Sequence, residues 1–216
     1  MLQSGKSSWI KRLLQLREKI FKNQPRRVFY IYTTKSKFVD ELYQEKLIDK
    51  AIKKLPSTYE KLEEMIAPYI DEGVILIIDD GLSQLRGGYL PTVFEEFASK
   101  NNTSVLFVSQ SIFVNNDNFI RISQNCHYIV FMANKRNPAR IRALAQQVKP
   151  CNQNFILKCY NDATKFKRLA SFSSPKKDGY GYLILDFTLP TPDVLMCRTN
   201  IFPDEIEPIT VYVERE

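Results

Sequence analysis

Three residues near the start of the chain, Gly5, Lys6 and Ser7, could bind the phosphates of a nucleotide. They match the end of the pattern G-x-x-x-x-G-K-[ST], in which backbone N–H groups and the lysine contact phosphate oxygens and the hydroxyl binds Mg²⁺. Ser4 and Ser8 flank them and complete the predicted nucleotide-binding segment. The first glycine of the pattern and the strand that normally feeds the loop would precede the chain. We therefore expect an N-terminal truncation within the phosphate loop.

Two carboxylates, Asp79 and Asp80, follow an apolar run over 73–78. A buried strand that ends in carboxylates is typical of a Walker B element, in which Asp79 would hold Mg²⁺ and Asp80 would orient and activate the attacking water. Gln110 comes after the next apolar run, where a polar residue could sense the γ-phosphate. A polar turn or strand end also explains each signal separately. Together, in this chain order, they favour a hydrolase that uses ATP and Mg²⁺.

The elements that would position these residues alternate between helices and strands. Apolar, β-rich runs predict strands at 28–32, 73–78, 104–108 and 128–132. Amphipathic or charged stretches predict helices at 9–21, over 36–70 with breaks near Pro56 and Pro68, and at 91–100, 116–125 and 138–148. Strands that are apolar throughout indicate a parallel sheet covered on both faces. The sequence therefore predicts an α/β fold.

The pattern changes after residue 150. A helix is predicted at 152–161, a strand at 181–188 that could pair with 194–198, and an edge strand at 209–213. We expect a core domain over residues 1–150 and a C-terminal helix and β extension over 151–216.

Composition excludes several classes of protein. The 216 residues are 44% hydrophobic and 25% charged, which are globular values. No apolar run approaches the roughly 20 residues of a membrane span, and no signal peptide is evident. The four cysteines form no C-x-x-C pair and there is one histidine, which disfavours a zinc site. We expect an intracellular protein that is neither secreted nor attached to a membrane.

Positive charge is concentrated in one part of the chain. The net charge is +7, and residues 135–177 hold eleven basic residues and one acidic residue. Such a segment could contact a polyanion, and Lys165, Lys167 and Arg168 are the candidate DNA-binding residues. A solvated surface is an equally good explanation of this stretch.

The order GKS, IIDD, VSQ along the chain resembles the FtsK–HerA lineage of P-loop ATPases. The segments LFVSQSIF at 106–113 and YLILD at 182–186 are similar to those of the DNA-packaging ATPases of Polinton, adenovirus-like and large DNA viruses. The resemblance implies a RecA-like P-loop fold with a mostly parallel sheet. It also implies a homo-oligomeric ring that packages double-stranded DNA into capsids, with capsid or portal components as further partners. The host nucleus or cytoplasm, or the virion, would be its location.

The resemblance also implies roles for individual residues. Asp80 is a catalytic carboxylate in place of the glutamate that many relatives carry, Gln110 is the sensor, and Lys6 is the phosphate clamp. Rings of this kind take an arginine finger from a neighbouring subunit. The candidate arginines are Arg86, Arg136, Arg140 and Arg142, of which Arg136 and Arg140 are favoured because they follow the strand at 128–132.

Two alternatives stay open. The first is a P-loop nucleotide kinase or GTPase, although the nearest match to the guanine-binding Asn-Lys-x-Asp element, at 134–137, ends in asparagine. The second is a non-catalytic DNA-binding or scaffold remnant of an endogenous element. The incomplete phosphate loop supports that second alternative. The strand expected before that loop is central in this fold, and its loss would leave two neighbouring strands with unpaired edges, so we predict poor solubility or no measurable ATPase activity for residues 1–216 alone.

Overall fold

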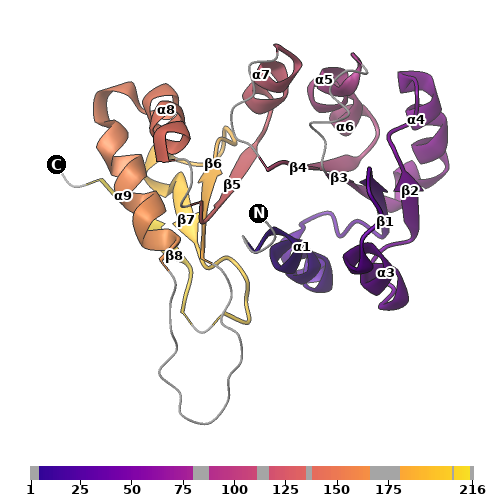
Figure 1. The fold of residues 1–216 in the computed structure, drawn as a ribbon, viewed down its shortest axis with the longest axis horizontal. Coiled ribbons are helices and arrows are strands. Elements are labelled where there is room, and N and C mark those ends of the chain that lie inside the picture. Colours follow the sequence, from indigo (N-terminus) through magenta and orange to yellow (C-terminus); the bar gives the residue numbers. More distant parts are fainter. Residues whose placement is uncertain are drawn as a thin grey trace, which may run out of the picture. The chain divides into compact units, whose positions relative to one another are not determined.

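The computed structural model describes residues 5–79, 88–110, 117–134, 138–165, 181–205 and 207–214. The chain forms two compact units. One unit, here called the parallel-sheet unit, comprises Lys11–Cys126, and the other, the antiparallel-sheet unit, comprises Met1–Ile10 and His127–Glu216. Most of their elements are labelled in Figure 1.

A four-stranded parallel sheet forms the centre of the first unit. In spatial order its strands are β2 (Lys50–Lys53), β1 (Arg27–Tyr32), β3 (Val74–Asp79) and β4 (Thr103–Val108). The central strands β1 and β3 are buried over nearly their whole length, as expected for strands covered on both faces. The α/β class and the parallel sheet are thus confirmed.

Helices cover both faces of this sheet (Figure 1). The helical segments of this unit are the part of α1 (Lys6–Gln15) from residue 11 on, α2 (Arg17–Ile20), α3 (Lys37–Gln44), α4 (Tyr59–Ile66), η1 (Ala67–Glu72), α5 (Leu90–Thr92), η3 (Val93–Phe97), α6 (Ala98–Lys100) and α7 (Asp117–Gln124). On one face, Phe29, Leu76 and Ile78 form a core with residues of α4, α5, η3 and α7. The alternate residues Tyr30 and Ile77 are buried on the opposite face, because successive side chains of a strand point to opposite faces.

The second unit is built on a four-stranded antiparallel sheet. Its strands, in spatial order, are β5 (Tyr128–Met132), β6 (Tyr182–Asp186), β7 (Cys197–Thr199) and β8 (Thr210–Tyr212). Its helices are α8 (Pro138–Val148), η4 (Pro150–Asn152), α9 (Gln153–Ala163) and η5 (Asp193–Leu195). Trp9, from the first part of α1, packs edge-on against Tyr182 and Phe202, with ring centroids 6.0 and 5.6 Å apart.

Several sequence predictions for the C-terminal part are confirmed. The helix at 138–148 has the predicted bounds, and proline at its first position suits a helix start. Strand β6 pairs with β7, and β8 lies at the edge of the sheet.

Two predictions about strands are wrong. The segment expected to be helical over 36–70 contains β2, a short strand at the edge of the sheet. Its sequence, KAIK, begins and ends with lysine, so its composition does not indicate a strand. The run at 128–132 is a strand, but it pairs antiparallel with β6 and does not extend the parallel sheet. An apolar run shows that a strand is buried, and it does not show which partner the strand takes. The compact units divide after Cys126, and the division into a core domain and an extension at residue 150 stays a prediction.

Among the residues that the structure describes, no helix is both long and apolar enough to cross a membrane.

Candidate functional site at the carboxyl ends of the parallel strands

Asp79 is the last residue of β3 and lies at the carboxyl edge of the parallel sheet, half-buried. It is in register with Val108 of the neighbouring strand β4, so Ser109 and Gln110 continue from β4 directly beside it. Gln110 is exposed. Ligands of open parallel sheets bind outside the carboxyl ends of the strands. The structure therefore brings Asp79 and Gln110 to the edge where such a ligand is expected.

A tyrosine that sequence reasoning missed contacts this carboxylate. The hydroxyl of Tyr30 donates a hydrogen bond of 2.7 Å to Oδ2 of Asp79. Tyr30 is fully buried in β1, and its pKa is raised far above the ordinary value by burial, with a further contribution from the negative charge of Asp79. The signal available in the sequence was a phenolic hydroxyl within an apolar strand, since buried tyrosine hydroxyls usually find a hydrogen-bond partner.

The predicted phosphate-binding residues lie at the start of α1. Gly5 has a φ of +84°, a left-handed conformation that favours glycine, and its carbonyl accepts the first described hydrogen bond of the helix, from the N–H of Trp9. Lys6 is half-buried, and Ser7 and Ser8 are exposed. The first-turn N–H groups of a helix have no intrahelical acceptors and can therefore face an anion.

The two halves of the predicted nucleotide site belong to different units. Gly5–Ser8 are grouped with the antiparallel-sheet unit, and Asp79 and Gln110 with the parallel-sheet unit. The association of these two halves stays a prediction.

The remaining candidates fall into two groups. Ser4, Asp80, Arg86, Arg136, Lys167 and Arg168 lie outside the described residues. Of the described candidates, Arg140 is half-buried in α8 and Arg142 is exposed in the same helix. Lys165 is exposed and forms an ion pair of 2.9 Å with Asp162 at the end of α9. A solvent-exposed pair of this kind contributes little energy, so the lysine could exchange its partner for a phosphate.

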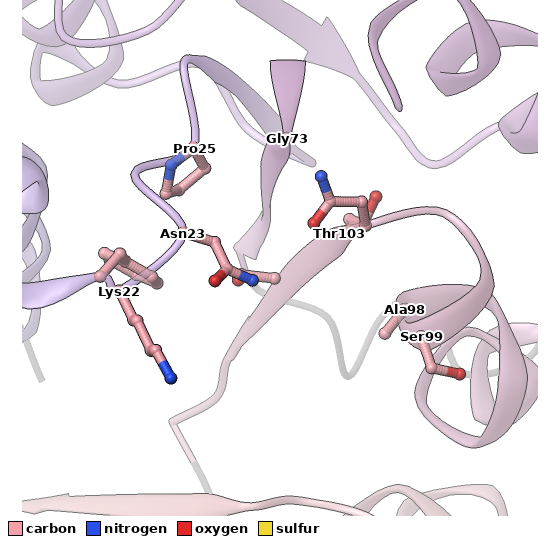
Figure 2. A pocket seen from close by; sticks show the side chains of 10 residues that line it. Lys22, Asn23, Pro25, Gly73, Ala98, Ser99 and Thr103 are labelled. Carbon is pink, nitrogen blue, oxygen red and sulfur yellow. The ribbon is translucent and has the colours of Figure 1, made fainter. Parts of the chain in front are cut away.

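A pocket of about 430 Å³ opens at the other end of the parallel strands (Figure 2). Its lining residues are Phe21, Lys22, Asn23, Pro25, Gly73, Ala98, Ser99, Asn102, Thr103 and Ser104. Gly73 precedes β3 and Thr103 begins β4, so the pocket lies at the amino ends of these strands. It is therefore separate from the edge that carries Asp79 and is not the predicted nucleotide site.

The donor groups at the carboxyl edge suit Mg²⁺ better than a transition metal. In the described part of the chain, no group of three or more His, Cys, Asp or Glu residues could hold a metal ion. Proteins commonly bind Mg²⁺ through one or two carboxylates together with phosphate oxygens of the substrate. A carboxylate such as Asp79 at the carboxyl end of a strand fits that requirement.

No protein-family model, curated protein or solved structure matches this chain.

Proposed function

We propose that this protein is a Mg²⁺-dependent ATPase that translocates double-stranded DNA and packages a viral or virus-like genome. The observation that carries the ATPase proposal is the position of Asp79. It ends a fully buried strand of a parallel sheet, next to the strand end that leads into Gln110. The sequence Gly5-Lys6-Ser7 at the start of α1 supplies the complementary phosphate-binding pattern.

In this proposal the two groups of residues divide the chemistry. Lys6 and the N–H groups at the start of α1 bind the phosphates. Ser7 and Asp79 would hold Mg²⁺, which neutralises charge on the phosphates when it is bound. Asp80 orients the attacking water, and Gln110 contacts the γ-phosphate. Gly5 supports this assignment because its positive φ allows a close approach of the backbone to an anion.

The DNA part of the proposal rests on the sequence resemblance and on charge. The positive excess of residues 135–177 is larger than that of the whole chain, which suits a partner that is recognised through its phosphates. A homo-oligomeric ring would bring an arginine of one subunit, Arg136 or Arg140, to the nucleotide of the next. Capsid or portal components are the further partners that packaging requires.

The first experiment separates the roles in nucleotide chemistry. ATP binding and hydrolysis are measured for the 216-residue chain and for a version with a designed strand and loop that complete the glycine pattern. Lys6→Ala should abolish binding, because it removes the phosphate clamp. Asp80→Asn should keep binding and lose hydrolysis, because it removes the group that activates water. Exposed Lys61→Ala is the control for the lysine.

Hydrolysis by the Asp80→Asn protein at the parent rate would refute the catalytic assignment. Absence of nucleotide binding by both forms of the parent would favour the non-catalytic alternative. A preference for GTP, or phosphoryl transfer to a second nucleotide, would favour the GTPase or kinase.

The second experiment tests the DNA-binding residues. Neutralising Lys165, Lys167 and Arg168 together should weaken duplex binding equally for all sequences. The slope of log affinity against log salt should become shallower by up to about 0.9 for each DNA phosphate that the variant no longer neutralises. The control neutralises three exposed lysines of the parallel-sheet unit, Lys46, Lys53 and Lys54. An unchanged affinity and slope in the first variant would assign this stretch to ordinary solvated surface.

A further inference from the structure

The contact between Tyr30 and Asp79 follows from the register of two central strands. Tyr30 of β1 is opposite Ile77 of β3, and Asp79 lies two residues further along β3. Residues two apart on a strand share one face, so Asp79 is the diagonal neighbour of Tyr30 on that face. The long side chain of tyrosine spans this diagonal and reaches Oδ2 at 2.7 Å.

The tyrosine itself has little freedom to move. Its side chain is fully buried and its ring packs edge-on against Phe38 of α3, with centroids 6.3 Å apart. A buried hydroxyl without its acceptor would carry the desolvation cost of an unsatisfied donor, so the hydrogen bond to Asp79 is strongly favoured. A rigid donor therefore holds a half-buried carboxylate at the end of the strand.

We propose that Tyr30 is a positioning residue that fixes the Asp79 carboxylate for Mg²⁺ at the carboxyl edge of the parallel sheet. This inference rests on the proposed nucleotide site and adds to it a residue that no sequence motif indicated. Groups that hydrogen-bond to a metal ligand orient it, and their removal typically lowers metal affinity 10- to 100-fold.

The test replaces Tyr30 by phenylalanine, which removes the hydroxyl and keeps the ring. A fluorescent ATP analogue is titrated without metal and then at increasing Mg²⁺, using both the 216-residue chain and the form with the completed loop. Tyr30→Phe should leave metal-free nucleotide affinity unchanged. It should raise the Mg²⁺ concentration at half-saturation about tenfold.

Two comparisons keep this test specific. Tyr89→Phe removes another half-buried hydroxyl of the same unit, which donates to the carbonyl of Pro56 at 2.5 Å, and it should not change the Mg²⁺ requirement. In an Asp79→Asn background, Tyr30→Phe should cause no further shift, because the carboxylate that it positions is absent.

An unchanged Mg²⁺ requirement in a folded Tyr30→Phe protein would overturn the inference and leave the nucleotide site intact. An equal shift in the Tyr89→Phe protein would also overturn it, since the effect would then be a general loss of stability. If neither parent form binds the nucleotide, the proposed function fails and the inference fails with it.

Discussion

Replacing Asp186 by asparagine should destabilise the antiparallel-sheet unit by about 3 kcal/mol. Asp186 ends β6 with its side chain only 3% exposed. One carboxylate oxygen accepts hydrogen bonds from the backbone N–H and the hydroxyl of Thr188, at 2.9 and 2.6 Å. The other accepts from the hydroxyl of Thr191 at 2.9 Å and from the guanidinium of Arg198.

The size of the effect follows from which of these hydrogen bonds asparagine can still accept. Its amide oxygen can still accept from Thr188, but its NH₂ group must face the donors Thr191 and Arg198. Removing one partner of a buried ion pair costs about 3–5 kcal/mol. We expect the lower end of this range, because the side chain of Arg198 is 29% exposed and water recovers part of its solvation.

The chain carries a convenient probe for this measurement. Its one tryptophan, Trp9, packs against Tyr182 and Phe202 in the same unit, so its fluorescence in a urea titration should report the unfolding of that unit. Exposed Asp193→Asn is the matched control, and it should change the free energy of unfolding by less than about 0.5 kcal/mol. If Asp186→Asn lowers the free energy of unfolding by less than about 1 kcal/mol, close to the control, the pair of Asp186 and Arg198 contributes little to the stability of this unit.

Three further predictions concern packing, pH and the sheet edge. A Cβ at Gly181 would lie 2.2 Å from the carbonyl oxygen of Ala163, so Gly181→Ala should lower the free energy of unfolding by about 1–3 kcal/mol; an unchanged Trp9 unfolding curve would contradict this. Burial raises the pKa of Cys126 from 9.0 to about 11, so the folded state keeps its proton longer than the unfolded state. The protonated thiol therefore contributes up to about 3 kcal/mol to the free energy of unfolding, fully below pH 9 and progressively less as the pH rises toward 11. Unfolding followed by circular dichroism should show a smaller loss of stability over this pH range in Cys126→Ala than in the parent. An equal loss in both proteins would refute the reasoning. Exposed Ser104 lies on β4, whose outer edge pairs with no other described strand. A charged residue on an edge strand opposes pairing with a second copy, so Ser104→Lys should slow self-association measured by light scattering. An unchanged rate would argue against pairing through this edge.

The sequence could predict those elements whose local pattern decides their structure. Strands β1 and β3 are apolar runs that are buried over nearly their whole length, β4 is a third, half-buried apolar run, and Pro138 marks the start of α8. Pairing could not be predicted in the same way. The partner of β5 is β6, which follows some fifty residues later, and nothing within 128–132 specifies it.

The sequence is equally unable to distinguish the candidate site from a structural ion pair. Asp79 and Asp186 both end an apolar strand, so the sequence signal is the same for both. The structure separates them: Asp186 is enclosed by Thr188, Thr191 and Arg198, whereas Asp79 is half-buried at the carboxyl edge of a parallel sheet. The contact of Tyr30 with Asp79 depends on strand register, which a single sequence does not specify.

The most direct test of the central claim is Mg²⁺-dependent ATP hydrolysis by the Asp79→Asn protein. It should be compared with the parent and with Asp71→Asn, which alters an exposed carboxylate in η1, the segment that precedes the same strand. All three proteins carry the completed phosphate loop. The account predicts Mg²⁺-dependent hydrolysis in the parent and in Asp71→Asn, and a loss of at least about 100-fold in Asp79→Asn. Hydrolysis at the parent rate by Asp79→Asn, or none by the parent, would contradict it.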